Sequence, residues 1–439
     1  MRVRTASVLG VFAVLAAGCT TGGHALPAPL PPVPAAARPL VAWSQAVCTS
    51  EQSLQGLASG IDEVNRTAAD PAQAGFLDPE LSSYVSGISS RLGQARDGLK
   101  AVTPSGVQAA DTHVTRLVQA LDELGKKAPA STTAQPTLAQ ARDLAKAVAG
   151  LEPGSEDLTK AVRSNAKLNA SFNVAPACRP VRQFGPADPA APTRALVAWS
   201  DTVCAAADSA ASLKATKIED LLITDPRYAR FSSYDLGSFL QSAGSGVADV
   251  VQALGTAEPT GIPAADHYRD SLRSALQAVQ PKLPAADASA DLAFRSVDEL
   301  KPPAQQAIGV LTTITLPSPD LPAIARATPV LAHSHDVAPR CRPLDSPPAT
   351  LPPAADGSDP GKCASGKCQV LVTGQADFTV AGQTFTISVA GPKVRVLQDL
   401  SEIQAGPGGT AQFGTDRQMV TVRVTAVLAG KAVVDISTQ

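Results

Sequence analysis

The run His333-Ser334-His335-Asp336 is the densest group of residues in this chain that could bind a metal. Two imidazoles and a carboxylate are accepted zinc ligands, and zinc with an open coordination position activates water for hydrolysis. The sequence contains no His-Glu-x-x-His motif that would complete such a site. We therefore keep His333, His335 and Asp336 as candidate ligands, interpret the run as a solvated loop, and expect neither a metal nor any other cofactor.

Two further patterns are incomplete as catalytic motifs. Gly406-Pro407-Gly408-Gly409 lacks the lysine and the following Ser or Thr of a phosphate-binding loop, and it favours a β-turn. The sequence has no Gly-x-Ser-x-Gly nucleophile elbow. Because no set of acid, base and nucleophile emerges, we expect no catalytic residues and interpret the protein as a non-enzyme.

The first nineteen residues resemble the signal sequence and lipobox of bacterial lipoproteins. Arg2 and Arg4 precede an apolar run, which leads into Leu15-Ala16-Ala17-Gly18-Cys19. The resemblance implies that residues 1–18 are removed and that Cys19 carries acyl chains such as palmitate. More than one acyl chain gives stable membrane attachment, whereas a single chain gives only marginal binding. An ordinary cleaved secretory signal, or an uncleaved anchor helix, is the alternative interpretation.

The remaining cysteines predict disulfides. Seven cysteines are present, so lipidation of Cys19 leaves an even number, as expected in an oxidising compartment. The sequence repeat described below favours the pairs Cys48–Cys178 and Cys204–Cys341, with Cys363–Cys368 as a local pair. A Cys178–Cys204 bridge is the competing possibility.

An internal repeat organises most of the chain. Residues 40–48, LVAWSQAVC, recur as LVAWSDTVC at 196–204, and residues 174–181, VAPACRPV, recur as VAPRCRPL at 337–344. A period this long indicates duplication of a whole domain rather than a solenoid of short repeats. Asp111 recurs as Asp266 after a Pro-containing turn. We interpret both aspartates as helix-entry residues rather than ligand contacts.

Each copy of the repeat has helical periodicity. Apolar residues at spacings of three, four or seven predict four or five helices per copy, packed as a small antiparallel bundle. Aromatic residues make up only 4% of the chain, so these cores must consist mainly of Ala, Leu and Val. Trp43 and Trp199 occupy matching places, and we interpret them as buried anchors rather than a ligand-stacking platform. The apolar stripe of the first copy comprises Leu81, Tyr84, Val85, Ile88, Leu92, Leu99 and Val102.

The C-terminal part changes to a period of two, which is typical of half-buried strands. Val420, Val422 and Val424 alternate with polar residues, and Ala381-Gly382 favours a hairpin turn. We expect about six short strands in a small sandwich or barrel.

The predicted fold class is therefore multidomain α + β: two tandem homologous disulfide-closed helical bundles, then a small all-β domain. Proline-rich stretches mark the joints between these parts. The predicted parts are a signal peptide at 1–18, a spacer at 19–39, helical repeats at 40–181 and 194–344 separated by a linker at 182–193, a Pro-rich linker at 345–362 and a β domain at 363–439.

Composition limits the function. The formal net charge is −2, and no basic patch of the kind that binds phosphates is present, so we expect no nucleic-acid partner. No apolar run long enough to span a membrane follows Cys19. The Ala/Pro-rich composition and layout resemble actinobacterial exported lipoproteins, many of which have no assigned function.

We expect a non-catalytic binding or scaffolding module on the extracytoplasmic face of the cell membrane. Its partner would be the membrane, through Cys19, together with an envelope protein or cell-wall component. The alternatives are an envelope hydrolase or metal-dependent enzyme that uses His333, His335 and Asp336, and a carrier that holds a small apolar ligand within the bundles.

Overall fold

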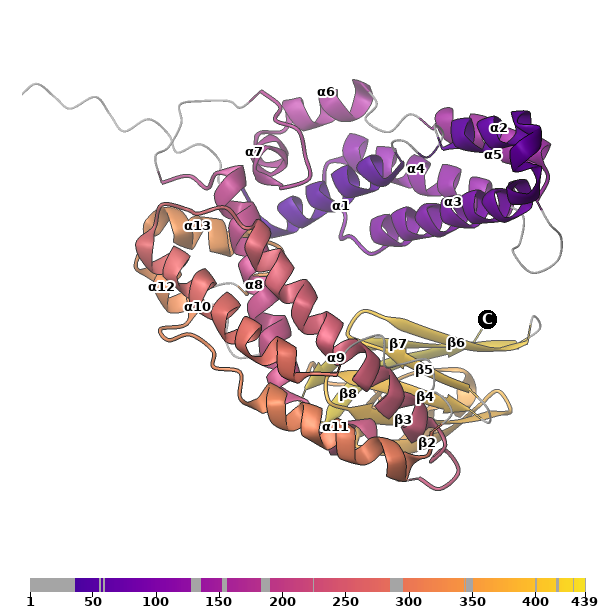
Figure 1. Ribbon diagram of the computed structural model, residues 1–439, viewed down its shortest axis with the longest axis vertical. Helices are drawn as coiled ribbons and strands as arrows, with labels where there is room; N and C mark the ends of the chain where they lie inside the picture. Colours follow the sequence, from indigo (N-terminus) through magenta and orange to yellow (C-terminus); the bar gives the residue numbers. More distant parts are fainter. Residues whose placement is uncertain are drawn as a thin grey trace, which may run out of the picture.

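The computed structural model shows a mostly helical part followed by an all-β part (Figure 1). The predictions for the signal sequence, for Cys19 and for most of the spacer concern residues outside the described ranges. We call residues 36–182 the first helical segment, residues 190–344 the second helical segment, and residues 350–438 the β region. The structure describes residues 36–54, 57, 60–127, 136–151, 156–182, 190–223, 225–284, 295–342, 344, 350–398, 401–415, 418–428 and 430–438.

The first helical segment buries an aliphatic core around one tryptophan. Trp43 is almost fully buried, as are the Leu, Val and Ile residues of the predicted apolar stripe on α3. This burial excludes Trp43 as a surface platform for a ligand. The helices are α1 (Arg38–Leu54), α2 (Ile61–Ala69), α3 (Leu77–Lys100), α4 (Gln108–Lys127), α5 (Leu138–Ala149), α6 (Glu156–Ser164) and α7 (Ala166–Val174), with the 3₁₀ helix η1 (Pro71–Phe76) before α3.

The second helical segment has a similar order of elements and also buries its tryptophan, Trp199. Here α9 packs against α8, α10 and α11, as α3 packs against α1 and α4 in the first segment. Its helices are α8 (Arg194–Ala215), α9 (Phe231–Thr256), α10 (Pro263–Val279), α11 (Val297–Thr312), α12 (Leu321–Arg326) and α13 (Pro329–Val337), with the 3₁₀ helix η2 (Ile218–Leu221) before α9.

The prediction of four or five helices per segment is wrong, because the described residues form more and shorter helices. A capping asparagine in the first segment and a proline in the second begin the last helix of each segment. The Asn165 side chain accepts a hydrogen bond from the Leu168 amide and starts α7 directly after α6. In the second segment Pro329, which lacks a backbone N–H, begins α13 shortly after α12. A side chain that satisfies the free N–H groups of a new helix makes such a break stable.

A disulfide closes each helical segment. Cys48 on α1 is bonded to Cys178 after α7, and Cys204 on α8 is bonded to Cys341 after α13. These are the pairs that the sequence favours, and no Cys178–Cys204 bridge is formed. Closing loops with sequence separations of 130 and 137 residues restricts the unfolded chain by about 5 kcal/mol per bridge in the chain-entropy account.

Asp111 and Asp266 each close the turn before a helix. The Asp111 carboxylate accepts hydrogen bonds from the amides of Ser105 and Gly106, at 2.7 and 3.0 Å. Asp266 accepts equivalent bonds from the amides of Thr260 and Gly261, at 2.8 and 3.1 Å. Both glycines have φ of 75°, a conformation that side chains rarely adopt. The helix-entry interpretation of both aspartates is confirmed.

The β region consists of two antiparallel four-stranded sheets, with strand orders β1-β8-β7-β6 and β2-β3-β4-β5. It contains eight strands rather than the six expected. Cys363 is bonded to Cys368 at the start of β1. The strands are β1 (Lys367–Thr373), β2 (Gln375–Val380), β3 (Gln383–Ala390), β4 (Lys393–Gln398), β5 (Ser401–Ala405), β6 (Thr410–Thr415), β7 (Gln418–Leu428) and β8 (Lys431–Thr438).

The two sheets share one apolar core. Phe385 of β3 stacks on Phe378 of the neighbouring strand and meets Phe413 of the other sheet edge to face, with ring centroids 4.7 Å apart. Edge-to-face aromatic pairs add to the free energy gained by burial. The predicted hairpin turn at Ala381-Gly382 joins β2 and β3, with positive φ at both residues, as a two-residue hairpin loop requires.

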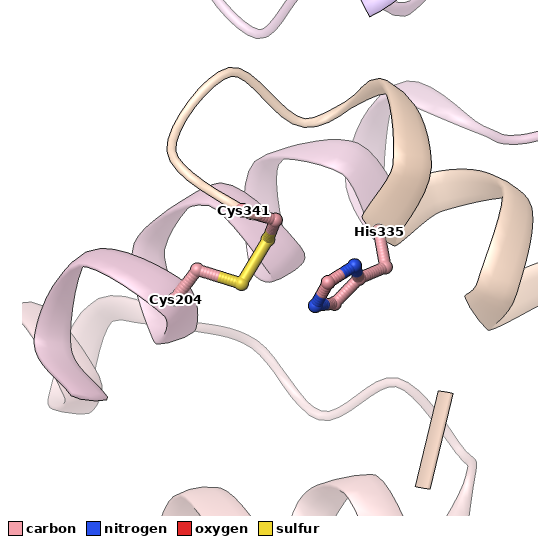
Figure 2. Close-up of side chains that lie close together, drawn as sticks. All are labelled: Cys204, His335 and Cys341. Carbon is pink, nitrogen blue, oxygen red and sulfur yellow. A yellow bond between two sulfur atoms is a disulfide. The ribbon is translucent and has the colours of Figure 1, made fainter. Parts of the chain in front are cut away.

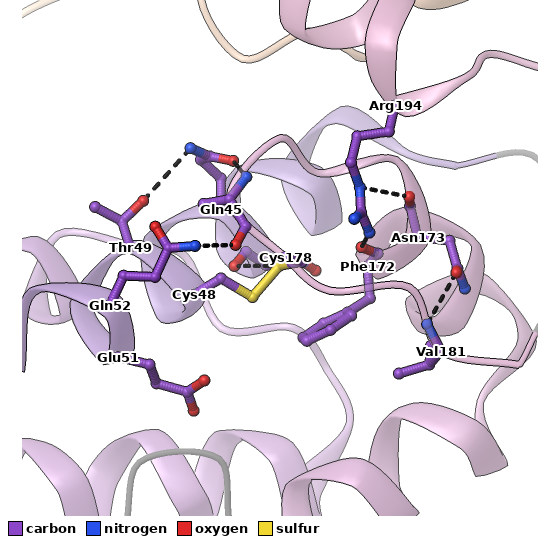
Figure 3. Close-up of a disulfide and its surroundings, with 12 residues drawn as sticks. Gln45, Cys48, Thr49, Glu51, Gln52, Phe172, Asn173, Cys178, Val181 and Arg194 are labelled. Atoms are coloured by element: carbon purple, nitrogen blue, oxygen red, sulfur yellow. Dashed lines mark hydrogen bonds between the residues drawn. A yellow bond between two sulfur atoms is a disulfide. The ribbon is translucent and has the colours of Figure 1, made fainter. Parts of the chain in front are cut away.

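Two arginines join the helical segments reciprocally. Arg38, at the start of α1, donates hydrogen bonds to the carbonyls of Asp336 and His335 at the end of α13, at 2.6 and 2.9 Å. Arg194, at the start of α8, donates to the carbonyls of Asn173 and Phe172 near the end of α7, at 3.1 and 3.5 Å (Figure 3). Helix C-terminal carbonyls attract cations. Burial lowers the pKa of both arginines.

Replacing either arginine with alanine should weaken the contact between the helical segments. A charged donor to a buried carbonyl contributes about 2 kcal/mol, so Arg38→Ala and Arg194→Ala should each reduce hydrogen-exchange protection at the ends of α13 and α7, respectively. Arg91→Ala, on the exposed face of α3, is the matched control and should change neither. An unchanged exchange rate in both variants would contradict the reciprocal arrangement.

Candidate functional site

The candidate metal ligands do not form a site. His333, His335 and Asp336 lie on α13, so the prediction of a solvated loop is wrong. His333 is exposed, and its Nδ1 lies 2.7 Å from the Ala190 carbonyl. His335 is only 2% exposed, whereas the Asp336 carboxylate accepts a hydrogen bond from the Leu344 amide. Residues two apart on a helix point in different directions, so the two imidazoles cannot bind one ion.

His335 lies beside the second disulfide instead. Figure 2 shows its imidazole next to the bonded sulfurs of Cys204 and Cys341. One potential ligand atom from each of the three residues lies within 4.8 Å of the others, but sulfurs bonded to each other are not thiolate ligands. The matching place in the first segment holds Phe172, whose ring lies beside Cys48–Cys178 (Figure 3). Burial, with a smaller effect of Arg38, lowers the pKa of His335 to about 4. The neutral ring therefore packs as an aromatic residue.

A large cleft lies between the second helical segment and the β region. Its volume is about 1720 Å³. One wall comes from α8, η2 and α9, and the other comes from the β3–β4 and β7–β8 turns with strands β4 and β5. Serine hydroxyls and carboxylates line the helical wall, and the exposed side chains of Tyr234 and Leu428 stand at the cleft. Ser238, Ser242 and Asp249 lie on the helical wall, and Lys393 faces them from the β region.

An ionic cluster of Arg395, Asp235, Glu402 and Gln404 lies where the two walls meet. Arg395 Nη2 is 2.8 Å from Asp235 Oδ2 in an ion pair, and its Nε is 3.6 Å from Glu402 Oε1. The side-chain amide of Gln404 donates to Asp235 at 2.8 Å and to Glu402 at 3.0 Å. Arg395 also donates to the Asp220 carbonyl. The side chains of Arg395, Asp235 and Glu402 are 5%, 5% and 6% exposed.

One guanidinium therefore serves two buried carboxylates. Glu402 Oε2 has no hydrogen-bond donor among the described residues. Burial raises the pKa of Asp235 against the opposing effects of Arg395, Gln404 and Lys393. Burial also raises the pKa of Glu402, and the neighbouring charge of Asp235 raises it further. Burying a carboxylate without a full set of partners is costly, and taking up a proton removes that cost.

Two further contacts hold the β region against the second helical segment. Ile223 and Tyr228 form a small apolar cluster with Leu397 of β4, against which Phe231 packs. On the exposed side, Arg227 lies between Asp225 at 2.6 Å and Asp377 of β2 at 3.1 Å. Hydrogen bonding to Arg227 lowers the pKa of Asp225 to about 2. Apolar, buried ionic and exposed ionic contacts together fix the width of the cleft.

Carboxylates with raised pKa beside an arginine occur at acid–base catalytic sites. In this cluster, however, the arginine and the glutamine amide contact the carboxylates, and little of either acid reaches solvent. The groups that a ligand would meet are hydroxyls, exposed apolar side chains and mixed charges on the cleft walls. These groups can hold a ligand through hydrogen bonds, charges and apolar contacts.

Sequence reasoning did not find the cleft. Its ionic cluster joins Asp235 to residues more than 150 positions further along the chain, and no local pattern signals such a contact. One signal was available: Lys393, Arg395 and Leu397 alternate on β4 and place two cations and an apolar residue on one face.

No protein-family model matches this chain, and no curated protein or solved structure shows significant similarity to it. Among the described residues, no helix combines the length and the apolar character needed to cross a membrane.

The ionic cluster makes contact between α9 and the β region pH-dependent. Raised carboxyl pKa values mean that the docked state binds more protons than the separated state, so stability falls as pH rises above about 4, the ordinary carboxyl pKa. Hydrogen exchange in α9 and β4, corrected for the intrinsic rate, should show greater protection at the lower pH. Asp225, whose pKa is lowered, contributes with the opposite sign and only below about pH 5.

Glu402→Gln tests the cause, because it leaves one carboxylate for one guanidinium. Its pH dependence should be weaker than that of the unchanged protein, because only Asp235 still has a raised pKa. Protection that rises with pH, or full pH dependence in Glu402→Gln, would contradict this account of the cluster.

Proposed function

We propose that this protein is a membrane-anchored extracytoplasmic lipoprotein that acts as a non-catalytic binding module of the cell envelope. The interdomain cleft is the observation that carries the proposal. Small-molecule sites usually measure about 300–1,000 Å³, whereas this cleft measures about 1720 Å³ and is partly open to solvent. An extended polymer of the envelope suits that size. Hydroxyl and carboxylate groups on the walls would fix the polymer's position, and Tyr234 and Leu428 would pack against it.

Three disulfides support a location outside the cytoplasm. Every cysteine within the described residues is paired with another, and such bridges persist in oxidising compartments. This agrees with removal of residues 1–18 and lipidation of Cys19. The proline-rich spacer after Cys19 would hold the helical segments away from the membrane surface.

The two helical segments are, in our proposal, homologous copies of one domain. Matched contacts support this interpretation, in addition to the repeated sequence motifs. Gln45 accepts a hydrogen bond from the Ala177 amide at 2.8 Å, and Asp201 accepts one from the Arg340 amide at 2.8 Å. The reciprocal bonds of Arg38 and Arg194 are those expected if two copies are related by an approximate two-fold axis.

Removal of Cys19 tests the anchor. The unchanged protein should incorporate an alkyne-labelled palmitate and sediment with membranes, whereas Cys19→Ser should lose the label and become soluble without detergent. Titration of free thiols should show the three disulfides intact in the variant. A variant that stays with membranes, or an unchanged protein that takes up no label, would contradict the lipoprotein proposal.

Filling the cleft tests the binding site. Ser242 lies on the cleft wall. Ser242→Trp should reduce co-sedimentation of the protein with cell-wall fragments, freed of lipid and protein, from the organism that makes it. We expect a reduction of about tenfold, because the indole would occupy the space in which the polymer binds. Ser86→Trp is the control, since Ser86 is exposed on α3 and does not line the cleft. Equal binding by both variants, or no binding by the unchanged protein, would contradict the proposal.

A further inference from the structure

The turn before α3 is the counterpart of the turn that the β region covers. Residues 70–76 read DPAQAGF, and residues 225–231 read DPRYARF. In both turns the aspartate Oδ1 accepts a hydrogen bond from the amide two residues later, at 2.9 Å. Its carbonyl accepts another bond from the amide of Gln73 or Tyr228. The two turns are therefore the same structural unit, each placed at the start of a long helix.

The two phenylalanines at the ends of these turns differ in solvent exposure. Phe231 is half-buried and packs against the cluster formed by Ile223, Tyr228 and Leu397, the last of which belongs to the β region. Phe76 is 69% exposed, more than any other large apolar side chain in the described part of the chain. An exposed aromatic ring at a position where its counterpart is covered points to a partner that lies outside the described residues.

Charge identifies the chemistry of that partner. From Thr67 to Ser90 the sequence carries Asp70, Asp78 and Glu80 but no lysine, arginine or histidine. Glu80 takes the place that Asp235 occupies in the second segment, where Arg395 of β4 pairs with the carboxylate. Lys393 contributes a favourable charge to the same aspartate.

We propose that Asp70, Phe76, Asp78 and Glu80 form a docking surface, here called the Phe76 surface, for a second envelope protein. The partner presents an apolar side chain next to lysine or arginine, as β4 presents Leu397 beside Arg395 and Lys393. Apolar contact with Phe76 supplies affinity, and attraction between the acidic rim and the partner's cations sets orientation and the rate of association. An anionic lipid surface is disfavoured, because all three charges on the Phe76 surface are negative.

The Phe76 surface is separate from the cleft. Only its comparison with the turn at residues 225–231 rests on the proposed duplication. This surface would give the protein two binding faces, one for an extended polymer and one for a protein. Loss of one face should leave the other intact, so wall-fragment binding should be unchanged in Phe76 variants.

Photo-crosslinking of the full-length protein in its host tests the proposal. A benzophenone amino acid at position 76 should give one defined adduct, and mapping should place the crosslink beside an apolar residue flanked by lysine or arginine. The double substitution Asp78→Lys and Glu80→Lys should reduce the adduct about tenfold, because like charges then face each other. The same probe at Leu316, another exposed apolar residue, is the control and should not give this adduct.

Several results would overturn the proposal. They are the absence of an adduct at position 76, an adduct with a second copy of this chain, the same adduct from position 316, and an adduct insensitive to charge reversal. Thermal unfolding of each variant shows whether the fold is intact. Because Phe76, Asp78 and Glu80 have largely exposed or half-buried side chains, their replacement should leave unfolding nearly unchanged.

Discussion

Covalent closure of the helical segments is the constraint on which the rest of the structure depends. The cores are aliphatic and rich in alanine, with one tryptophan near the start of each segment. Such cores gain less free energy per residue than cores with many large side chains. The bridges Cys48–Cys178 and Cys204–Cys341 limit the unfolded chain instead. They also hold the last helix of each segment beside the first, which places the carbonyl ends of α7 and α13 where Arg194 and Arg38 reach them.

The second helical segment differs from the first because the β region packs against it. Its surface turn contains Tyr228 and Arg227 where the first segment has Gln73 and Ala72. These side chains add an aromatic contact and an ion pair to the common turn. The buried cluster around Arg395 then sets how close the β region comes to α9. Because one guanidinium faces two carboxylates, this junction is held less firmly when both acids are ionised.

The same comparison of the two segments explains the placement of the proposed binding sites. The cleft exists because the β region leans against one part of the second segment and leaves the helical wall beside it open. The Phe76 surface exists because nothing within the described chain covers the corresponding part of the first segment. In the proposed duplication, divergence of a few surface residues gave the two copies different partners while the capped turns at Asp111 and Asp266 stayed alike.

The sequence by itself determined the features that repeat locally or recur in order along the chain. Period-three-to-four and period-two apolar patterns indicate helices before strands, and the recurring motifs around the cysteines favour two of the three disulfide pairs. It also indicates the turns at Ala381-Gly382 and before Asp111. These features depend on near neighbours or on a recurring motif, so they can be found without knowing which distant residues meet.

The tertiary structure alone decided where those elements meet. Contacts between distant residues decide several features of the site. They place His335 on a buried helix beside a disulfide, bring two carboxylates to Arg395 and form the cleft. The same holds for Phe76 and Phe231, which end similar turns but differ in what covers them. Burial and charge pairing are properties of the packed molecule, because they are set by which surfaces come together and not by the residues next in sequence.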